Sequence, residues 1–310
     1  METVEKSGLV GQRQRSTAGA LFGSSAYLIW GLSPLFWKVL QTIPALELIC
    51  HRIVWSFAFL IPFVLFLGKQ RNEFKQIFVR PKTLVILLIT SLLVGSNWLV
   101  YVWAVNNDRV LEASLGFYIN PLVNVFLGMV FLRERMRLLQ GLAVALACGG
   151  VVFLTLEYGE FPTASLYLAF TFGVYGLIRK VAPVSAITGL TVEALILTLP
   201  ALVYLGYLNA SGAGTFGQKG ISTDLFLMGT ALVTAPPLLL FTLGAQRLAL
   251  STMGFLQYIA PTCMFFLGIW LYHEPFTQAQ VTIFLLIWTA LAIYSADSLL
   301  VYRKSYRYDS

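Results

Sequence analysis

Four of the ionisable residues inside long apolar stretches stand out, because a charge there is costly and marks a candidate functional site. Arg52 and Glu193 each lie eight residues into such a stretch, and the two stretches enter the membrane from opposite sides. Glu47 and His51 are one helical turn apart on the stretch that holds Arg52, so they share a helix face. Arg52 could bind an anion, while Glu47, His51 or Glu193 could carry a proton. The alternative is a structural ion pair, for example between Arg52 and Glu193, that locks two helices and contacts no ligand.

Ten stretches long enough to cross a membrane position these residues. Apolar residues make up 58% of the 310-residue chain and charged residues 11%. A soluble domain carries about 25% charged residues, and a disordered chain has low hydrophobicity, so both classes are excluded. A membrane-spanning helix needs about 20 mostly apolar residues. The predicted all-α spans are Ala18–Trp37, Pro44–Leu67, Leu84–Ala104, Val110–Leu132, Leu138–Leu156, Pro162–Leu177, Ser185–Tyr207, Leu225–Leu243, Ser251–Tyr272 and Gln278–Leu300.

The distribution of Lys and Arg between the loops predicts the orientation of the chain. Of the 21 basic residues, 17 lie in the two tails and in every second loop, including Arg179 and Lys180 after the sixth span. Three lie in the other loops, and Arg52 lies inside a span. Basic residues concentrate on the cytoplasmic side, so we expect both ends to be cytoplasmic. This distribution accounts for the net charge of +7, and no nucleic-acid partner is expected.

Motifs of enzymes, cofactors and metals are missing from the sequence. The three cysteines and two histidines form no CxxC or HExxH pattern, and neither a phosphate-binding loop nor a GxSxG nucleophile motif occurs. We therefore expect no enzyme activity, no cofactor and no metal site. Without a nucleotide-binding motif, any active transport must use an ion gradient or the gradient of the solute.

An internal repeat indicates how the spans are organised. The motif Tyr-Ile-x-Pro, followed after seven residues by Gly and after six more by Glu, starts at Tyr118 and again at Tyr258. The copies end at Glu134 and Glu274. Five spans per copy is an odd number, so the second copy must be inverted. The predicted parts are tail 1–17, repeats 18–156 and 157–300, and tail 301–310. Transporters commonly use inverted repeats, with the substrate site near mid-membrane between them.

The repeat also indicates candidate hinges and candidate residues that line the substrate cavity. A proline inside a span removes a backbone donor, and the repeat relates Pro121 to Pro261, so we predict paired hinges there. Polar and aromatic side chains in mid-span could bind a solute, or could instead bond neighbouring helices, and the prolines could be static kinks. The residues predicted to line the cavity, besides Arg52 and Glu193, are Tyr118, Tyr258, Asn97 and Trp30.

Three stretches resemble a known transporter family. They are AYLIWGLSPLFW at 26–37, ELICHRIVW at 47–55 and SLGFYINPL at 114–122. They are similar to the RarD-type branch of the EamA family, in the drug/metabolite transporter superfamily, and the resemblance extends over about residues 18–300. It implies a ten-helix permease of the bacterial inner membrane with five-plus-five inverted repeats. It does not define the substrate.

We therefore expect a secondary transporter that exports a small organic solute, either coupled to protons or as a facilitator. The expected partners are the solute, the lipid bilayer and, through the peripheral fifth and tenth spans, a second copy in a homodimer. One alternative is a membrane-embedded enzyme or lipid-handling protein that uses Arg52 on a headgroup. Another is a channel or receptor-like subunit. An inverted repeat favours alternating access over both.

Overall fold

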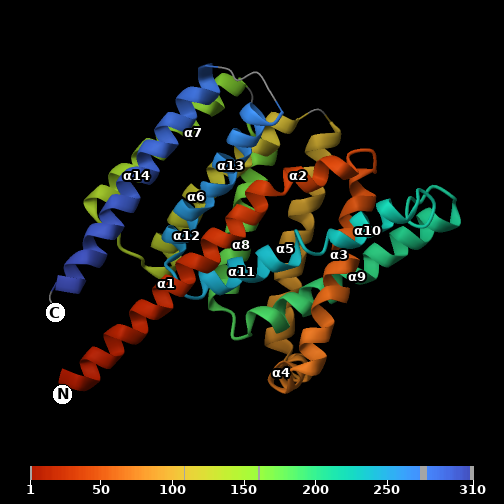
Figure 1. The fold of residues 1–310 in the computed structure, drawn as a ribbon, viewed down its shortest axis with the longest axis horizontal. Helices are drawn as coiled ribbons and strands as arrows, with labels where there is room; N and C mark the ends of the chain where they lie inside the picture. The colour runs from red at the N-terminus through yellow and green to blue at the C-terminus, as the bar shows by residue number, and fades with distance from the viewer. Residues whose placement is uncertain (1, 108, 160, 273–277, 308–310) are drawn as a thin grey trace.

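The computed structural model describes residues 2–107, 109–159, 161–272 and 278–307. This part of the chain is helical and contains no strand (Figure 1). Seven of its helical segments are long and apolar enough to cross a membrane. They are α3 (Ala45–Phe66), α5 (Pro81–Asn106), α6 (Val110–Leu132), α7 (Leu138–Tyr158), α9 (Ala186–Ala210), the pair α12 and α13 (Leu250–Gln257 and Ile259–Trp270), and α14 (Gln278–Arg307).

The other helices are shorter or less apolar. The longest, α1, begins at Glu2 and therefore covers most of the segment predicted as the N-terminal tail. Helix α4 connects α3 to α5 and carries basic side chains, as expected for a helix outside the apolar layer. The bounds are α1 (Glu2–Leu32), α2 (Pro34–Trp37), the 3-10 helix η1 (Lys38–Leu40), α4 (Gly68–Val79), α8 (Thr163–Val181), α10 (Ile221–Gly229) and α11 (Ala235–Ala245).

The predicted span Leu225–Leu243 is divided between two helices and is not one continuous helix. Helix α10 ends at Gly229, a turn follows, and α11 starts at Ala235. The cause is the pair Pro236 and Pro237. Proline has no N–H to bond back to the preceding turn, and it disfavours helical geometry in the residue before it. The prolines are tolerated in the first turn of α11, where N–H groups have no helical partner.

The two repeat-related prolines lie in different backbone surroundings. Helix α6 continues without interruption through Pro121. In the second copy the helix is interrupted at Tyr258, between α12 and α13, and Pro261 lies in the first turn of α13. The first predicted span is interrupted in a similar way, because α1 ends at Leu32, shortly before Pro34.

Figure 1 shows how the helices are arranged. Helices α7 and α14 run side by side along one edge of the molecule, and α3, α9 and α10 form the opposite part. Helix α1 crosses between them and packs against α11 and α13, while α6 packs against α8 and α12. The N-terminal end of α1 and the C-terminal end of α14 lie on the same side.

Carboxylates from distant segments cap the starts of three helices. The first N–H groups of a helix have no partner within it, and a carboxylate there also meets the positive end of the helix dipole. Glu73 caps α9, Glu112 caps α8 and Glu134 caps α12. Glu274, the repeat partner of Glu134, lies outside the described residues. The bonded N–H groups belong to Ser185, Ala164 and Leu250, at 2.7, 2.6 and 2.6 Å.

Candidate functional site

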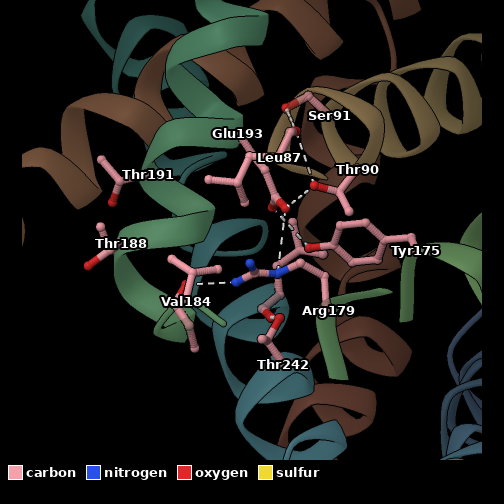
Figure 2. A network of polar contacts seen from close by, with 12 residues as sticks. Leu87, Thr90, Ser91, Tyr175, Arg179, Val184, Thr188, Thr191, Glu193 and Thr242 are labelled. Atoms are coloured by element: carbon pink, nitrogen blue, oxygen red, sulfur yellow. Dashed lines mark hydrogen bonds and ion pairs between the residues drawn. The ribbon is translucent and has the colours of Figure 1, made fainter. Parts of the chain in front are cut away.

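Glu193 is the carboxylate at the centre of a buried polar network (Figure 2). Its Oε1 lies 3.5 Å from Nε of Arg179, and the two side chains are 2% and 0% exposed. The Thr90 hydroxyl donates to Oε1 at 2.5 Å, and the Tyr175 hydroxyl donates to Oε2 at 3.3 Å. Helices α5, α8 and α9 thus converge on one carboxylate, which has an ion-pair partner and two hydrogen-bond donors.

Local sequence explains how Arg179 fits at this position. Tyr175 and Arg179 are four residues apart on α8, so they share a helix face. Gly189 lies one turn before Glu193 on α9, and an added Cβ there would stand 2.8 Å from Cζ of Arg179. The guanidinium therefore occupies the space that the glycine leaves. Its Nη2 donates to the carbonyl of Ala186 at 3.2 Å, which holds it against the first turn of α9.

The structure corrects the place predicted for Arg179. We predicted that it lies in a cytoplasmic loop, but α8 continues to Val181 and the Arg179 side chain is fully buried. The structural ion pair considered between Arg52 and Glu193 is also not formed, because Glu193 pairs with Arg179. One feature of the sequence does indicate that Arg179 belongs to the helix: it follows Tyr175 by four residues at the end of an apolar stretch, so the two share a helix face.

Arg52 lies in different surroundings. Its Nε donates to the Thr234 hydroxyl at 3.0 Å, just before the start of α11. Its Cζ lies over the rings of Trp37 and Trp98, 4.9 and 4.6 Å from their centroids. Within the described part of the chain, no carboxylate lies at ion-pair distance from Arg52. Aromatic rings stabilise the cation without neutralising it.

A small cavity lies between α3, α5, α9 and α11. Its volume is about 20 Å³, which is enough for roughly one water molecule. Its wall contains Trp98 and Thr234, the partners of Arg52, together with Ser56 and Glu193. The rest of the wall is aliphatic, so a single narrow space adjoins both the surroundings of Arg52 and the carboxylate of Glu193.

Glu47 and His51 lie on another face of α3. Glu47 is buried and accepts hydrogen bonds from the backbone N–H and the hydroxyl of Thr215, at 2.6 and 3.0 Å. Its Oε1 lies 3.9 Å from Nε2 of His51, whose ring packs against Phe216 with 5.4 Å between centroids. Both residues, with Trp55, line a second and more open cavity of about 460 Å³ beside α9. The hydrogen bonds from Thr215 to Glu47 therefore hold the loop before α10 against α3.

The repeat-related tyrosines contact each other. The Tyr258 hydroxyl donates to the backbone carbonyl of Tyr118 at 3.3 Å. Tyr258 is buried, and the Tyr118 ring packs edge-on against Phe284 of α14. Neither tyrosine lines the two cavities described above. The structure therefore places them between α6, α12 and α14, away from Arg52 and Glu193.

Asn97 and Trp30 contact α8. The Asn97 amide donates to the carbonyl of Leu168 at 2.8 Å, which bonds α5 to α8. Trp30 packs edge-on against Phe172, with centroids 5.9 Å apart. Phe172 in turn packs against Tyr175, which donates to Glu193. Trp30 is thus joined to the buried network through two aromatic rings, whereas Asn97 links two helices.

Long apolar helices around buried charged groups define a polytopic membrane protein. The model of the EamA-like transporter family matches residues 17–156. Protein RarD of Salmonella typhi is 44% identical over 291 residues, which cover 94% of this chain and 99% of that protein. Protein RarD of Escherichia coli (strain K12) is 41% identical over 292 residues, covering 94% and 98%.

An uncharacterized transporter of Pseudomonas aeruginosa is 46% identical over 280 residues, covering 90% of this chain and 94% of that protein. A crystal structure superposes with a TM-score of 0.69 over 90% of this chain and 97% of its own, at 18% identity, and so shows the fold alone. The chain belongs to the EamA family of membrane transporters, in its RarD-type branch. The expectation of a transporter rather than an enzyme is thereby confirmed.

Proposed function

We propose that the protein is a secondary transporter that exports a small organic solute across the bacterial inner membrane, with both termini cytoplasmic. The observation that carries this proposal is the position of the charged groups. The Glu193–Arg179 pair and the surroundings of Arg52 adjoin one cavity between helices of both halves of the chain. Inverted-repeat transporters place their substrate and coupling groups at this position, near mid-membrane between the repeats.

The packing of the helices supports ten spans in two inverted repeats, 18–156 and 157–300. The first repeat would comprise α1, α3, α5, α6 and α7, and the second α8, α9, α10–α11, α12–α13 and α14. In this arrangement each helix of the first repeat has a counterpart in the second. The contact between α1 and α11 corresponds to the contact between α8 and α5, and the contact between α6 and α8 corresponds to that between α13 and α1. All four of these pairs pack in the structure. The pairs α3–α9, α6–α12 and α7–α14 map onto themselves and also pack. The family model ends at residue 156, the proposed end of the first repeat.

The closed cavity suggests what must move. A space of about 20 Å³ admits no organic solute, so the surrounding helices must separate on one side and then on the other. The helix breaks before α11 and at Tyr258 leave backbone that can bend, and Pro121 and Pro261 are the proposed hinges. Protonation of Glu193 would remove the charge that attracts Arg179, so a proton gradient could drive the change between the two states.

Uptake into proteoliposomes tests this function. Purified protein would be given a mixed metabolite pool, with and without an imposed pH gradient, beside Glu193→Gln and the control Glu157→Gln. Glu157 is an exposed carboxylate near the end of α7. We expect accumulation that follows the pH gradient in the wild type and the control and is lost in Glu193→Gln. Transport that ignores the gradient would contradict proton coupling, and no movement of any solute by folded protein would contradict the transporter.

A further inference from the structure

We propose that the transported solute carries a carboxylate, and that Arg52 binds it through the free edge of its guanidinium at the helix break before α11. This inference rests on the proposed transport function and names the substrate class for that site. Three features of the structure support it: the missing counter-charge of Arg52, the geometry of its contacts, and the helix end that it contacts.

The first feature is the missing counter-charge. A charge inside a membrane protein is normally paired, because removing it from water is costly. Arg179 follows this rule through Glu193. Arg52 has no such partner among the described residues, and the hydrogen bond that the structure assigns to its side chain is the one from Nε to Thr234. Its two terminal nitrogens remain available as donors to a ligand.

The second feature is which part of the guanidinium is open. The Cζ of Arg52 lies over the rings of Trp37 and Trp98, and the Nε position is occupied by Thr234. The edge formed by Nη1 and Nη2 is left. Its parallel N–H bonds match the two oxygens of a carboxylate in a bidentate contact. The indole rings also offer apolar walls to the body of the solute.

The third feature is the end of α11. Thr234 is the N-cap of this helix, so Arg52 lies beside its positive end. Two positive groups side by side favour a bound anion. Helix α11 cannot supply the hydrogen-bond donors itself, because Pro236 and Pro237 have no N–H and the N–H of Ala235 bonds to the carbonyl of Ala231. The donors must come from Arg52, and the helix contributes its field.

The number of charges selects the kind of anion. A phosphate monoester carries nearly two negative charges at neutral pH and needs more than one cation to leave water. Arg52 is a single cation, so it balances one negative charge. The wall of the cavity beside its contacts is mainly aliphatic. A monoanionic carboxylate on an apolar or aromatic body fits both conditions.

Ligand-induced thermal stabilisation of the purified full-length protein in detergent, at constant pH, tests the substrate class. The probes are the matched pairs benzoate and benzamide, and indole-3-acetate and indole-3-acetamide. We expect the carboxylates to raise Tm and the amides to have no effect. Arg52→Gln should raise the half-saturating carboxylate concentration at least tenfold, and Arg52→Lys should have a smaller effect. The matched control is Arg247→Gln, since the Arg247 guanidinium also lies over a ring, that of Phe22, and donates to the carbonyl of Leu243.

The outcomes separate this proposal from the proposed function. Equal stabilisation by amides and carboxylates, or carboxylate binding unchanged in Arg52→Gln, would overturn the carboxylate site even if the protein transports solutes. Arg52-dependent carboxylate binding without transport in proteoliposomes would support the site and contradict the transporter. If Arg52→Gln does not fold, Arg52→Lys together with Thr234→Val serves the same comparison, and retention of wild-type binding in both would overturn the proposal.

Discussion

Two arginines in apolar helices of this protein lie in opposite kinds of surroundings. Arg179 is 0% exposed and pairs with Glu193, whose carboxylate also accepts two hydroxyl hydrogen bonds. Arg52 contacts two indole rings and one hydroxyl, and within the described residues it meets no carboxylate. The charge of Arg179 is therefore neutralised by the protein, whereas the charge of Arg52 is not. A charge inside an apolar helix is thus not by itself evidence of a ligand site, because Arg179 has its counter-charge within the protein.

The two arginines also differ in the backbone around them. Arg179 lies on an uninterrupted helix and fills the space beside Gly189 on the next one. Arg52 bonds to Thr234 at a helix break, where the chain turns between α10 and α11. The first arrangement is closely packed and leaves no room for a solute. The second places the guanidinium beside an interrupted helix, with its terminal nitrogens outside the hydrogen bond to Thr234.

Breaking the Arg179 pair should have the largest effect. Arg179→Ala leaves a buried carboxylate without its counter-charge, and such a change costs about 3–5 kcal/mol. We expect a strongly lowered thermal unfolding temperature in detergent. The double variant Arg179→Met with Glu193→Leu removes both charges at similar volume and should regain most of the stability. If Arg179→Ala unfolds at the wild-type temperature, the pair does not stabilise the fold.

Displacing the Arg179 guanidinium without altering any charge should have the next largest effect. The methyl group in Gly189→Ala overlaps the guanidinium, and such overpacking costs about 1–3 kcal/mol. Gly141→Ala on α7 is the control, because a Cβ there meets nothing within 4 Å. Gly189→Ala should unfold at a lower temperature than the wild type, whereas Gly141→Ala should unfold at the wild-type temperature or above it. Equal behaviour would show that Arg179 moves aside at no cost.

Glu73, on α4 outside the predicted spans, is a carboxylate that accepts several hydrogen bonds. Burial alone would raise the pKa of Glu73, but hydrogen bonds from Ser185 and Thr188 and the charge of Lys69 lower it below its usual value. Glu73→Gln should cost about 1 kcal/mol at neutral pH, as the loss of a helix cap does. A lowered pKa means that this stabilisation is complete above the usual carboxyl pKa, about 4.3, and is lost as the pH falls through the lowered value.

Unfolding temperatures measured from pH 7 downward check this expectation. The gap between the wild type and Glu73→Gln should be constant near neutral pH and close below about pH 4. Glu157→Gln, at an exposed position, should show no gap at any pH. A gap for Glu73→Gln that persists unchanged into acid would mean that the carboxylate charge does not contribute to the cap.

Removing the Arg52 charge should have the smallest effect on stability. Arg52→Met loses one hydrogen bond, worth about 1 kcal/mol, and two ring contacts, but it also removes an unpaired charge from the apolar layer. We expect a net change below about 1 kcal/mol in thermal unfolding, in contrast to Arg179→Ala. Destabilisation as large as that of Arg179→Ala would show that the protein itself supplies the counter-charge of Arg52.

The class of protein, a helical membrane transporter, could be predicted from the sequence because it depends on the chemistry of neighbouring residues. Apolar stretches of membrane length become helices wherever they stand, and charged residues inside them are visible as letters. The prediction of a transporter of this family is confirmed. Arg52 and Glu193 are visible in the sequence as charged groups within spans, and Glu193 lines a cavity whose wall also contains Trp98 and Thr234, the contacts of Arg52.

The partner of each charge could not be predicted in this way. Helices α8 and α9 must pack beside α5 before Arg179, Thr90 and Tyr175 can meet Glu193, and no spacing along one chain encodes that meeting. Residue counting placed Arg179 in a loop because it lies at the end of an apolar stretch, where most basic residues reach water. The break before α11 was signalled by two prolines, yet its contact with Arg52 involves residues 182 apart.

The sequence by itself therefore determined a polytopic helical transporter and the presence of Arg52 and Glu193 within its apolar segments, since hydrophobicity and helix formation act on neighbouring residues. Only the tertiary structure decided which charge is neutralised within the protein, since Glu193 pairs with Arg179 whereas Arg52 contacts two indole rings and a hydroxyl. That decision depends on distances of a few ångströms between helices, because the attraction that pairs two charges weakens with separation and in water.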